Sequence, residues 1–153
     1  MEKLYLSKFE CDQIITNLIK QIIRSNEQFT HIVGIANGGL NVSFPISSRL
    51  NIPHKSITLK FYDDETTPSE TPKKLDFSEL NDLDSNCNLL FCDDLIDTGI
   101  SLLYLKNNIK FKHKTAVMYW NKNNKYNITP DYFYYEKPKQ WLVFHWETKK
   151  DTI

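Results

Sequence analysis

The chain has 153 residues, 41% of them hydrophobic and 25% charged, and its 19 basic residues balance its 19 acidic residues. This length suits one domain with a substantial core, and the composition is ordinary for a globular protein. The zero formal net charge argues against a nucleic-acid binder that works through bulk electrostatic attraction. No run of about 18 apolar residues is present and the N-terminus lacks a signal-peptide core, so we expect no membrane association.

The cysteines are three in number, Cys11, Cys87 and Cys92, and their spacing is not that of a metal site. Cys92 ends an apolar run, where a thiol behaves as a small hydrophobic group. Reduced structural thiols in a cytoplasmic protein are therefore expected.

The first predicted element is a helix over residues 8–25. Ser7-Lys8-Phe9-Glu10 has the pattern of a capping box, in which a serine and a glutamate satisfy backbone N–H groups at a helix start. Behind it, apolar residues recur at helical spacing: Phe9, Ile14, Ile15, Leu18, Ile19, Ile22 and Ile23. We expect this helix to lie against a sheet.

A strand, a turn, a helix and a second strand follow. Residues 31–36 are predicted to form a short buried strand, and 37–39 a glycine-containing turn. Residues 40–50 are predicted to form a helix that is irregular at Pro45, and residues 54–59 the next strand.

The second half of the chain begins with a polar stretch, residues 61–86, which we predict to be a long loop that is either functional or disordered. Then come a strand at 88–92, a helix over about 99–109, a strand at 115–120 and an aromatic-rich segment, 121–153. This alternation of strands and helices predicts an α/β fold with a central parallel sheet flanked by helices.

The most informative segment is Leu89-Leu90-Phe91-Cys92-Asp93-Asp94-Leu95-Ile96-Asp97-Thr98-Gly99-Ile100-Ser101. Apolar residues of a buried strand run directly into two adjacent carboxylates, which suit sugar hydroxyls or a divalent cation. The following turn places hydroxyls and backbone N–H groups at a helix N-terminus, which suits a phosphate. In an open α/β sheet, ligands bind at such strand ends.

This segment closely resembles the signature of type I phosphoribosyltransferases, in the branch that acts on 6-oxopurines. The resemblance implies the type I phosphoribosyltransferase fold, with a small C-terminal hood over the base. The chain would be a single domain, 1–153, with a core of about 1–120, a hood of about 121–153 and a flexible lid loop of about 61–86.

The resemblance assigns roles to the signature residues. Asp93 and Asp94 would bind the ribose hydroxyls of 5-phosphoribosyl-1-pyrophosphate (PRPP) and, with Glu147, magnesium. Asp97 would be the catalytic residue beside the purine N7. The 5′-phosphate would be bound by Asp97, Thr98, Gly99, Ile100 and Ser101.

A second loop, Asn37-Gly38-Gly39, resembles the family's pyrophosphate-binding loop. Related purine enzymes often have arginine where this chain has Asn37. Arginine supplies a fixed charge and asparagine only a neutral donor, so the backbone N–H groups of residues 37–39 would have to bind the leaving group. Tyr62 resembles a residue at the base of the lid, and Lys73 and Lys74 would meet the pyrophosphate on closure.

The base-binding residues are expected in the C-terminal part. By the same resemblance Trp141 stacks on the purine and Leu142 contributes main-chain hydrogen bonds. Lys122 is either the donor to the purine O6 or a solvated loop lysine. Trp146 and His145 are interpreted as packing or surface residues.

The predicted function is purine salvage: transfer of 5-phosphoribosyl from PRPP to N9 of hypoxanthine, guanine or xanthine, with Mg²⁺, in a cytoplasmic dimer or tetramer. One alternative is a phosphoribosyltransferase for another base. A second is a non-catalytic regulator that keeps the PRPP pocket, an alternative favoured by Asn37. A third is an unrelated phosphate-binding flavodoxin-like domain, which would have no use for an aromatic hood.

Overall fold

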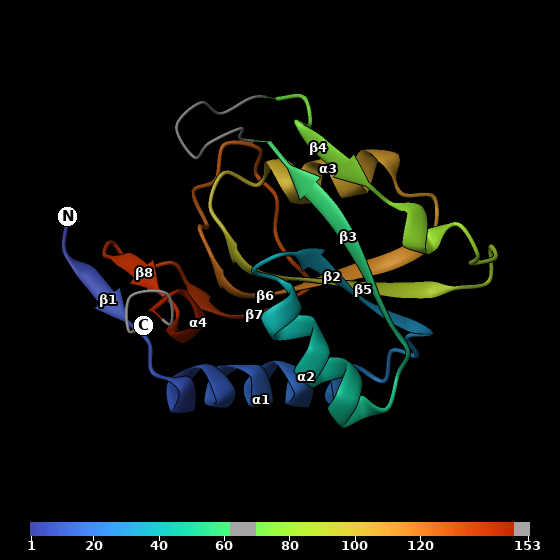
Figure 1. Ribbon diagram of the computed structural model, residues 1–153. Helices are drawn as coiled ribbons and strands as arrows, with labels where there is room; N and C mark the ends of the chain where they lie inside the picture. Colours follow the sequence, from blue (N-terminus) through green and yellow to red (C-terminus); the bar gives the residue numbers. More distant parts are fainter. Residues whose placement is uncertain (62–69, 149–153) are drawn as a thin grey trace.

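The computed structural model describes residues 1–61 and 70–148 and contains a six-stranded sheet between two helical layers (Figure 1). The elements in chain order are β1 (Lys3–Tyr5), α1 (Lys8–Ser25), β2 (His31–Ala36), α2 (Leu40–Leu50), β3 (His54–Lys60), β4 (Lys74–Asp76), a 3₁₀-helix (Ser78–Leu80), β5 (Asn88–Ile96), α3 (Ile100–Asn108), β6 (Lys112–Trp120), β7 (Tyr132–Glu136), β8 (Trp141–Val143) and α4 (His145–Thr148).

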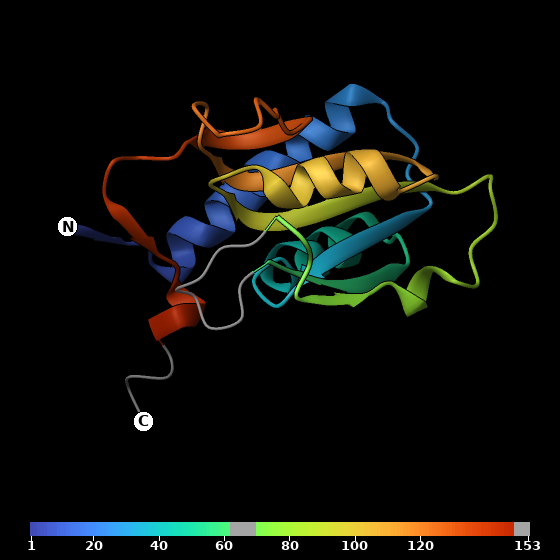
Figure 2. The same ribbon diagram turned by 90° about the horizontal axis from the view of Figure 1, so that it is seen from above.

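The main sheet has the strand order β4-β3-β2-β5-β6-β7, and every neighbouring pair is parallel except β3 and β4. Helices α1 and α2 cover one face and α3 the other, which Figure 2 shows from above. A separate two-stranded sheet pairs β1 with β8 at one side of the molecule. The predicted α/β architecture is confirmed.

The central strand β5 divides the core into two parts. Leu90 and Cys92 pack in the cluster that contains α1 and α2, while Leu89 and Phe91 pack in the cluster that contains α3. Successive side chains of a strand point to opposite faces, so a strand covered by helices on both sides must be apolar throughout. This explains the uninterrupted apolar run before the acidic pair.

Helix α1 begins as its sequence predicts. The Glu10 N–H donates to Ser7 Oγ over 3.0 Å, and Glu10 Oε1 accepts from the Ser7 N–H over 3.1 Å. The helix ends at Asn26, which adopts the left-handed conformation with φ 58°. No helix of the described chain, residues 1–61 and 70–148, is long and apolar enough to cross a membrane.

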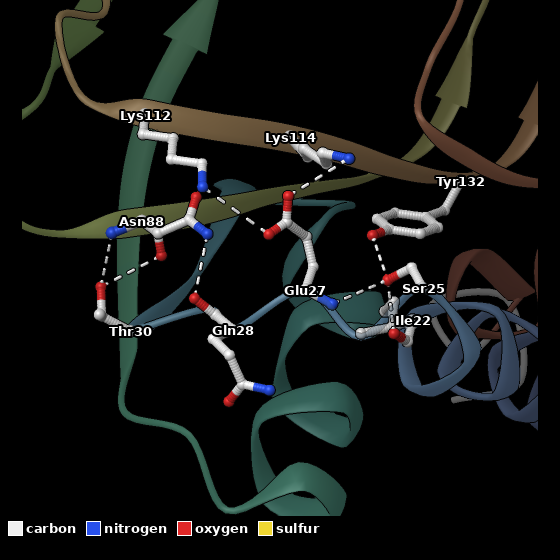
Figure 3. Close-up of polar contacts among 9 residues, drawn as sticks. All are labelled: Ile22, Ser25, Glu27, Gln28, Thr30, Asn88, Lys112, Lys114 and Tyr132. Atoms are coloured by element: carbon white, nitrogen blue, oxygen red, sulfur yellow. Dashed lines mark hydrogen bonds and ion pairs between the residues drawn. The ribbon is translucent and has the colours of Figure 1, made fainter.

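A polar network joins the amino ends of the strands, opposite the predicted site (Figure 3). Glu27, between α1 and β2, lies 3.4 Å from Lys114 Nζ and 3.9 Å from Lys112 Nζ, both at the start of β6. Asn88, at the start of β5, donates through its amide to the Gln28 carbonyl and through its N–H to Thr30 Oγ1. These contacts connect the segment between α1 and β2 to the starts of β5 and β6 at the amino ends of the strands. The candidate ligand-binding loops lie at the opposite, carboxyl ends.

The predicted long loop at 61–86 is wrong in its second half. Residues 74–76 form β4, which pairs antiparallel with β3, and the 3₁₀-helix follows. All three side chains of β4 are exposed, so this edge strand carries no alternating apolar pattern by which it could be recognised. Tyr62 and the tip of the predicted lid lie outside the described residues.

The boundary between core and hood also differs from the prediction. β7 lies within the segment assigned to the hood, yet it extends the main sheet beside β6. Strand β5 continues to Ile96, so the two acids lie inside the strand rather than after it. The hood consists of β8 and α4 together with the N-terminal strand β1, whose three exposed residues gave no signal in the sequence.

We expect Leu18→Ala to lower the free energy of unfolding by about 3 kcal/mol, because Leu18 is fully buried between α1 and the sheet and the truncation leaves a cavity. Urea denaturation would measure the change. The control is Ile23→Ala on the same helix, where 58% of the side chain is exposed and a change below about 1 kcal/mol is expected. Equal losses in the two variants would contradict the assigned packing face.

Candidate active site

The candidate site lies between β2 and β5, where the direction in which successive strands are added to the sheet reverses. The connection after β2 leads to β3 on one side, and the connection after β5 leads to β6 on the other, although β2 and β5 are neighbours. Loops that leave two such strands in opposite directions open a crevice at their carboxyl ends. The Asn37–Gly39 loop and the Asp97–Ser101 loop occupy these two positions.

The two acids are fixed by the backbone. Asp93 Oδ1 accepts from the Asp94 N–H over 2.8 Å, and Asp94 Oδ1 accepts from the Leu95 N–H over 2.8 Å. Burial raises the pKa of Asp93 well above its ordinary value, and the neighbouring Asp94 carboxylate raises it further. Burial likewise raises the pKa of Asp94. A hydroxyl donor or a cation at this pair would favour its charged form.

The turn after Asp97 leads directly into the N-terminus of α3. Gly99 has φ 87°, and a Cβ at this position would lie 2.7 Å from Asn124 Oδ1, so only glycine fits. The Thr98 hydroxyl accepts from the Ile100 N–H over 3.3 Å. The next N–H groups, from Ser101 onward, belong to the first helical turn, where the macrodipole favours an anion.

The glycine loop after β2 departs from the prediction at Gly39. The Gly39 N–H donates to the Ile35 carbonyl over 2.9 Å, so it is not available to a pyrophosphate. A Cβ on Gly39 would lie 2.4 Å from the Cys92 carbonyl oxygen. The structure therefore gives Gly39 a packing role, and only Asn37 and Gly38 of the predicted set remain exposed or half-buried.

Gly38 connects the two loops. A Cβ on Gly38 would lie 2.3 Å from Asp94 Oδ2, which places this carboxylate directly against the loop after β2. The missing side chain thus allows the Asp94 carboxylate to lie directly against the predicted pyrophosphate loop.

A cavity of about 590 Å³ opens at the carboxyl ends of β2 and β3, lined by Ala36, Asn37, Thr58, Lys60, Lys74, Leu75 and Asp76. Two lysines, Lys60 and Lys74, therefore face the same space as Asn37. Asn37 occupies the position at which the family resemblance leads us to expect an arginine. Lys60 was not singled out from the sequence, because a lysine at a strand end resembles any surface residue. Thr58, two residues earlier on β3, is the register partner of Ala36, and Lys60 itself pairs with Lys74 of β4, so only the strand pairing brings Lys60 to this cavity.

Lys122 lies just beyond β6, where the sequence placed it. Its Nζ lies 3.4 Å from Glu136 Oε2, and Trp120 and Glu136 are register partners at the ends of β6 and β7. Asp97 is exposed beside this loop, and Asn121 contacts it. The structure thus assembles Asp97, Asn121 and Lys122 at the carboxyl ends of β5 and β6.

The hood presents an exposed aromatic side chain and main-chain groups that face away from β1. Trp141 is 60% exposed, as a stacking residue requires, whereas the Leu142 side chain is buried. The Trp141 N–H and the Val143 carbonyl bond to the chain around β1, and adjacent residues of a strand point these groups to opposite edges. The main-chain groups of Leu142 therefore face away from β1, as the prediction requires. Trp146 stacks on Phe144 at 4.8 Å, a packing role.

The carboxylates that could bind magnesium are those of Asp93 and Asp94. Within residues 1–61 and 70–148 no group of three or more metal-ligating side chains is assembled, so Glu147 does not complete a protein-only site with Asp93 and Asp94. Mg²⁺ nevertheless prefers hard oxygen donors and commonly binds through one or two carboxylates plus substrate phosphates. The acidic pair against Gly38 fits that mode of binding.

Comparisons with known proteins identify the family. The model of the phosphoribosyl transferase domain matches residues 6–152, and the chain belongs to this family. The purine phosphoribosyltransferase of Pyrococcus horikoshii is 26% identical, with a TM-score of 0.76, over 96% of this chain and 95% of that one. The search of curated proteins gives no match.

Two further solved structures share the fold. The xanthine-guanine-hypoxanthine phosphoribosyltransferase of Helicobacter pylori is 16% identical over 99% of this chain and 96% of its own, with a TM-score of 0.76. A Neisseria gonorrhoeae protein solved with bound ppGpp is 18% identical, covers 95% and 89% of the two chains and has a TM-score of 0.76. The predicted phosphoribosyltransferase fold is confirmed.

We expect Asp93→Asn to stabilise the ligand-free protein by about 1 kcal/mol at pH values where wild-type Asp93 is ionised. The raised pKa of Asp93 means that its charge destabilises the folded state, and an asparagine Oδ1 still accepts from the Asp94 N–H. The gain should shrink as the pH falls through the raised pKa, because wild-type Asp93 then becomes protonated. Urea denaturation over a pH series from mildly alkaline to mildly acidic would measure both. A stability difference that does not change with pH would contradict this account.

Proposed function

We propose that this protein transfers the 5-phosphoribosyl group of PRPP to N9 of a 6-oxopurine, giving a nucleoside 5′-monophosphate and pyrophosphate. The observation that carries the proposal is the presence of three groups along the carboxyl ends of the parallel strands, on both sides of the switch point between β2 and β5. These are an acidic pair suited to ribose hydroxyls, a helix N-terminus suited to a phosphate and a lysine-lined cavity suited to pyrophosphate. The P. horikoshii and H. pylori structures, both named as purine enzymes, support the substrate class.

The chain's own residues account for binding of PRPP. The turn from Thr98 to Ser101 holds the 5′-phosphate, and Asp93 and Asp94 accept hydrogen bonds from the ribose hydroxyls. Lys60 and Lys74 supply positive charge to the pyrophosphate in place of an arginine at position 37. Magnesium, held by Asp93 and Asp94, would neutralise the leaving group when bound.

Residues at the ends of β5, β6 and β8 act on the base. Trp141 stacks on the purine while the main chain of Leu142 contacts the ring edge. Asp97 accepts the proton at N7 as N9 attacks C1′ of the ribose. Lys122 leaves its ion pair with Glu136 when the base binds, and its ammonium group then donates to the purine O6. A donor at O6 selects against the 6-amino group of adenine, which favours an oxopurine.

We also propose that the protein works in the cytoplasm as a homo-oligomer. All three cysteines are free and buried, as suits a reducing compartment. Exposed aromatic side chains on the edge strand β7, Tyr134 and Tyr135, offer apolar surface for a subunit contact.

The decisive experiment is a spectrophotometric turnover assay with PRPP, Mg²⁺ and hypoxanthine, guanine, xanthine or adenine. We expect turnover of at least one oxopurine and a kcat/KM for adenine at least about 100-fold lower. Turnover of adenine alone would overturn the base assignment. If calorimetry shows that PRPP binds but no base is turned over, the proposed enzymatic function is wrong and the protein is a non-catalytic PRPP-binding regulator.

We expect Lys60→Ala to raise the KM for PRPP about tenfold, because one of the two cations of the pyrophosphate cavity is lost. Steady-state kinetics at saturating base would measure the change. Lys20→Ala, an exposed lysine on α1, is the matched control. Asn37→Arg should restore affinity in the Lys60→Ala background, since it returns a cation to the same cavity. An unchanged KM in Lys60→Ala would refute the role.

A further inference from the structure

A side chain that the sequence did not single out lies against the carboxylate of Asp97. The Asn121 amide nitrogen donates to the Asp97 carbonyl over 3.2 Å and to Asp97 Oδ1 over 3.3 Å. Within residues 1–61 and 70–148, this amide is the only side chain that bonds to the Asp97 carboxylate. Because Asp97 is exposed at the end of β5, its rotamer would otherwise be free.

The orientation of the Asn121 amide is determined by its other end. Asn121 Oδ1 accepts from the Asn123 N–H over 3.0 Å, which leaves the NH₂ group to face Asp97. The Asn121 N–H donates to the Ile96 carbonyl over 2.8 Å, extending the register of β5 and β6 by one step. Both the backbone and the side chain of Asn121 are therefore held relative to Asp97.

A second asparagine makes the supporting loop rigid. Asn124 is only 8% exposed, and its amide donates to the carbonyls of Asn121 (3.0 Å) and Ile128 (2.7 Å). Its Oδ1 accepts from the Ile128 N–H over 2.9 Å and lies next to Gly99. The loop after β6 is thus stabilised by its own hydrogen bonds and packs against the turn that carries Asp97.

We propose that Asn121 is a positioning residue that aims the Asp97 carboxylate at the base, an inference that rests on the proposed role of Asp97. Asn121 holds Oδ1, so Oδ2 remains to accept the proton at purine N7. Fixing the carboxylate before the base arrives removes the cost of ordering it during the reaction. Asn121 itself touches neither the substrate nor the reacting atoms.

Two substitutions separate this role from simple support of the loop. Asn121→Asp keeps the oxygen that accepts from the Asn123 N–H but loses the donor to Asp97, whereas Asn121→Ala loses both. We expect kcat with the preferred oxopurine to fall about tenfold or more in both variants, with the KM for PRPP within about twofold of wild type. Asn123→Ala is the matched control, since Asn123 contributes its backbone N–H. Wild-type kcat in Asn121→Asp would overturn the proposal.

A double-mutant cycle tests whether Asn121 acts through Asp97. In an Asp97→Asn background, Asn121→Ala should have no further effect on kcat, because the carboxylate that it positions is absent. A structural role would give the same fold-loss in both backgrounds, and that result would refute positioning.

The final readout does not depend on turnover. Three-bond couplings of the Asp97 Cγ to the backbone nitrogen and carbonyl carbon report its side-chain rotamer by NMR. We expect one rotamer in wild type and in Asn123→Ala, and rotamer averaging in Asn121→Asp and Asn121→Ala. Averaging in wild type overturns the proposal. If wild type shows one rotamer but transfers phosphoribose to no base, the proposed function fails while the Asn121 contact stands.

Discussion

The close approach of two backbones at Gly39 is the constraint on which this site depends. At this position the loop after β2 packs against the carbonyl of Cys92 in β5, and no side chain larger than hydrogen fits between them. This contact places Gly38 against Asp94, while Asn37, the residue before Gly38, lines the cavity that holds Lys60 and Lys74. Without it the two loops, which leave neighbouring strands in opposite directions, would lie farther apart.

The sequence predicted the parts of the fold that have strong local signals. The capping box and apolar period of α1, and the apolar run of β5 that leads into Asp93 and Asp94, were recognisable because each pattern reflects burial of neighbouring residues. β4 and β1 were missed because their side chains are exposed on every position, so only pairing with a distant strand defines them. β7 was assigned to the hood because its aromatic composition does not reveal that it pairs with β6 in the main sheet.

Residues of the candidate site could be proposed from the sequence where a motif is contiguous, and could not where the site is assembled from separate segments. Thr98 to Ser101 needed only the strand–turn–helix context. Lys60 and Asn121 are ordinary surface residue types in sequence, and their importance comes from the parallel neighbours that bring them to Asn37 and Asp97. Gly39 shows the reverse: a residue of a binding motif whose N–H is already used within the fold.

The pairing of β1 with β8 has a consequence for how the base subsite forms during folding. It joins residues from the two ends of the described chain, Lys3 with Trp141, and β1 itself buries none of its side chains. Closure of so large a loop is entropically costly, and β1 adds little apolar burial in return, whereas Leu142 of β8 and the adjacent Phe144 belong to the core. Strand β1 should therefore pair with β8 after the six-stranded core has formed and separate from it most easily. Under the proposed function, entry and exit of the base would then be governed by release of β1, while the PRPP loops stay anchored in the core.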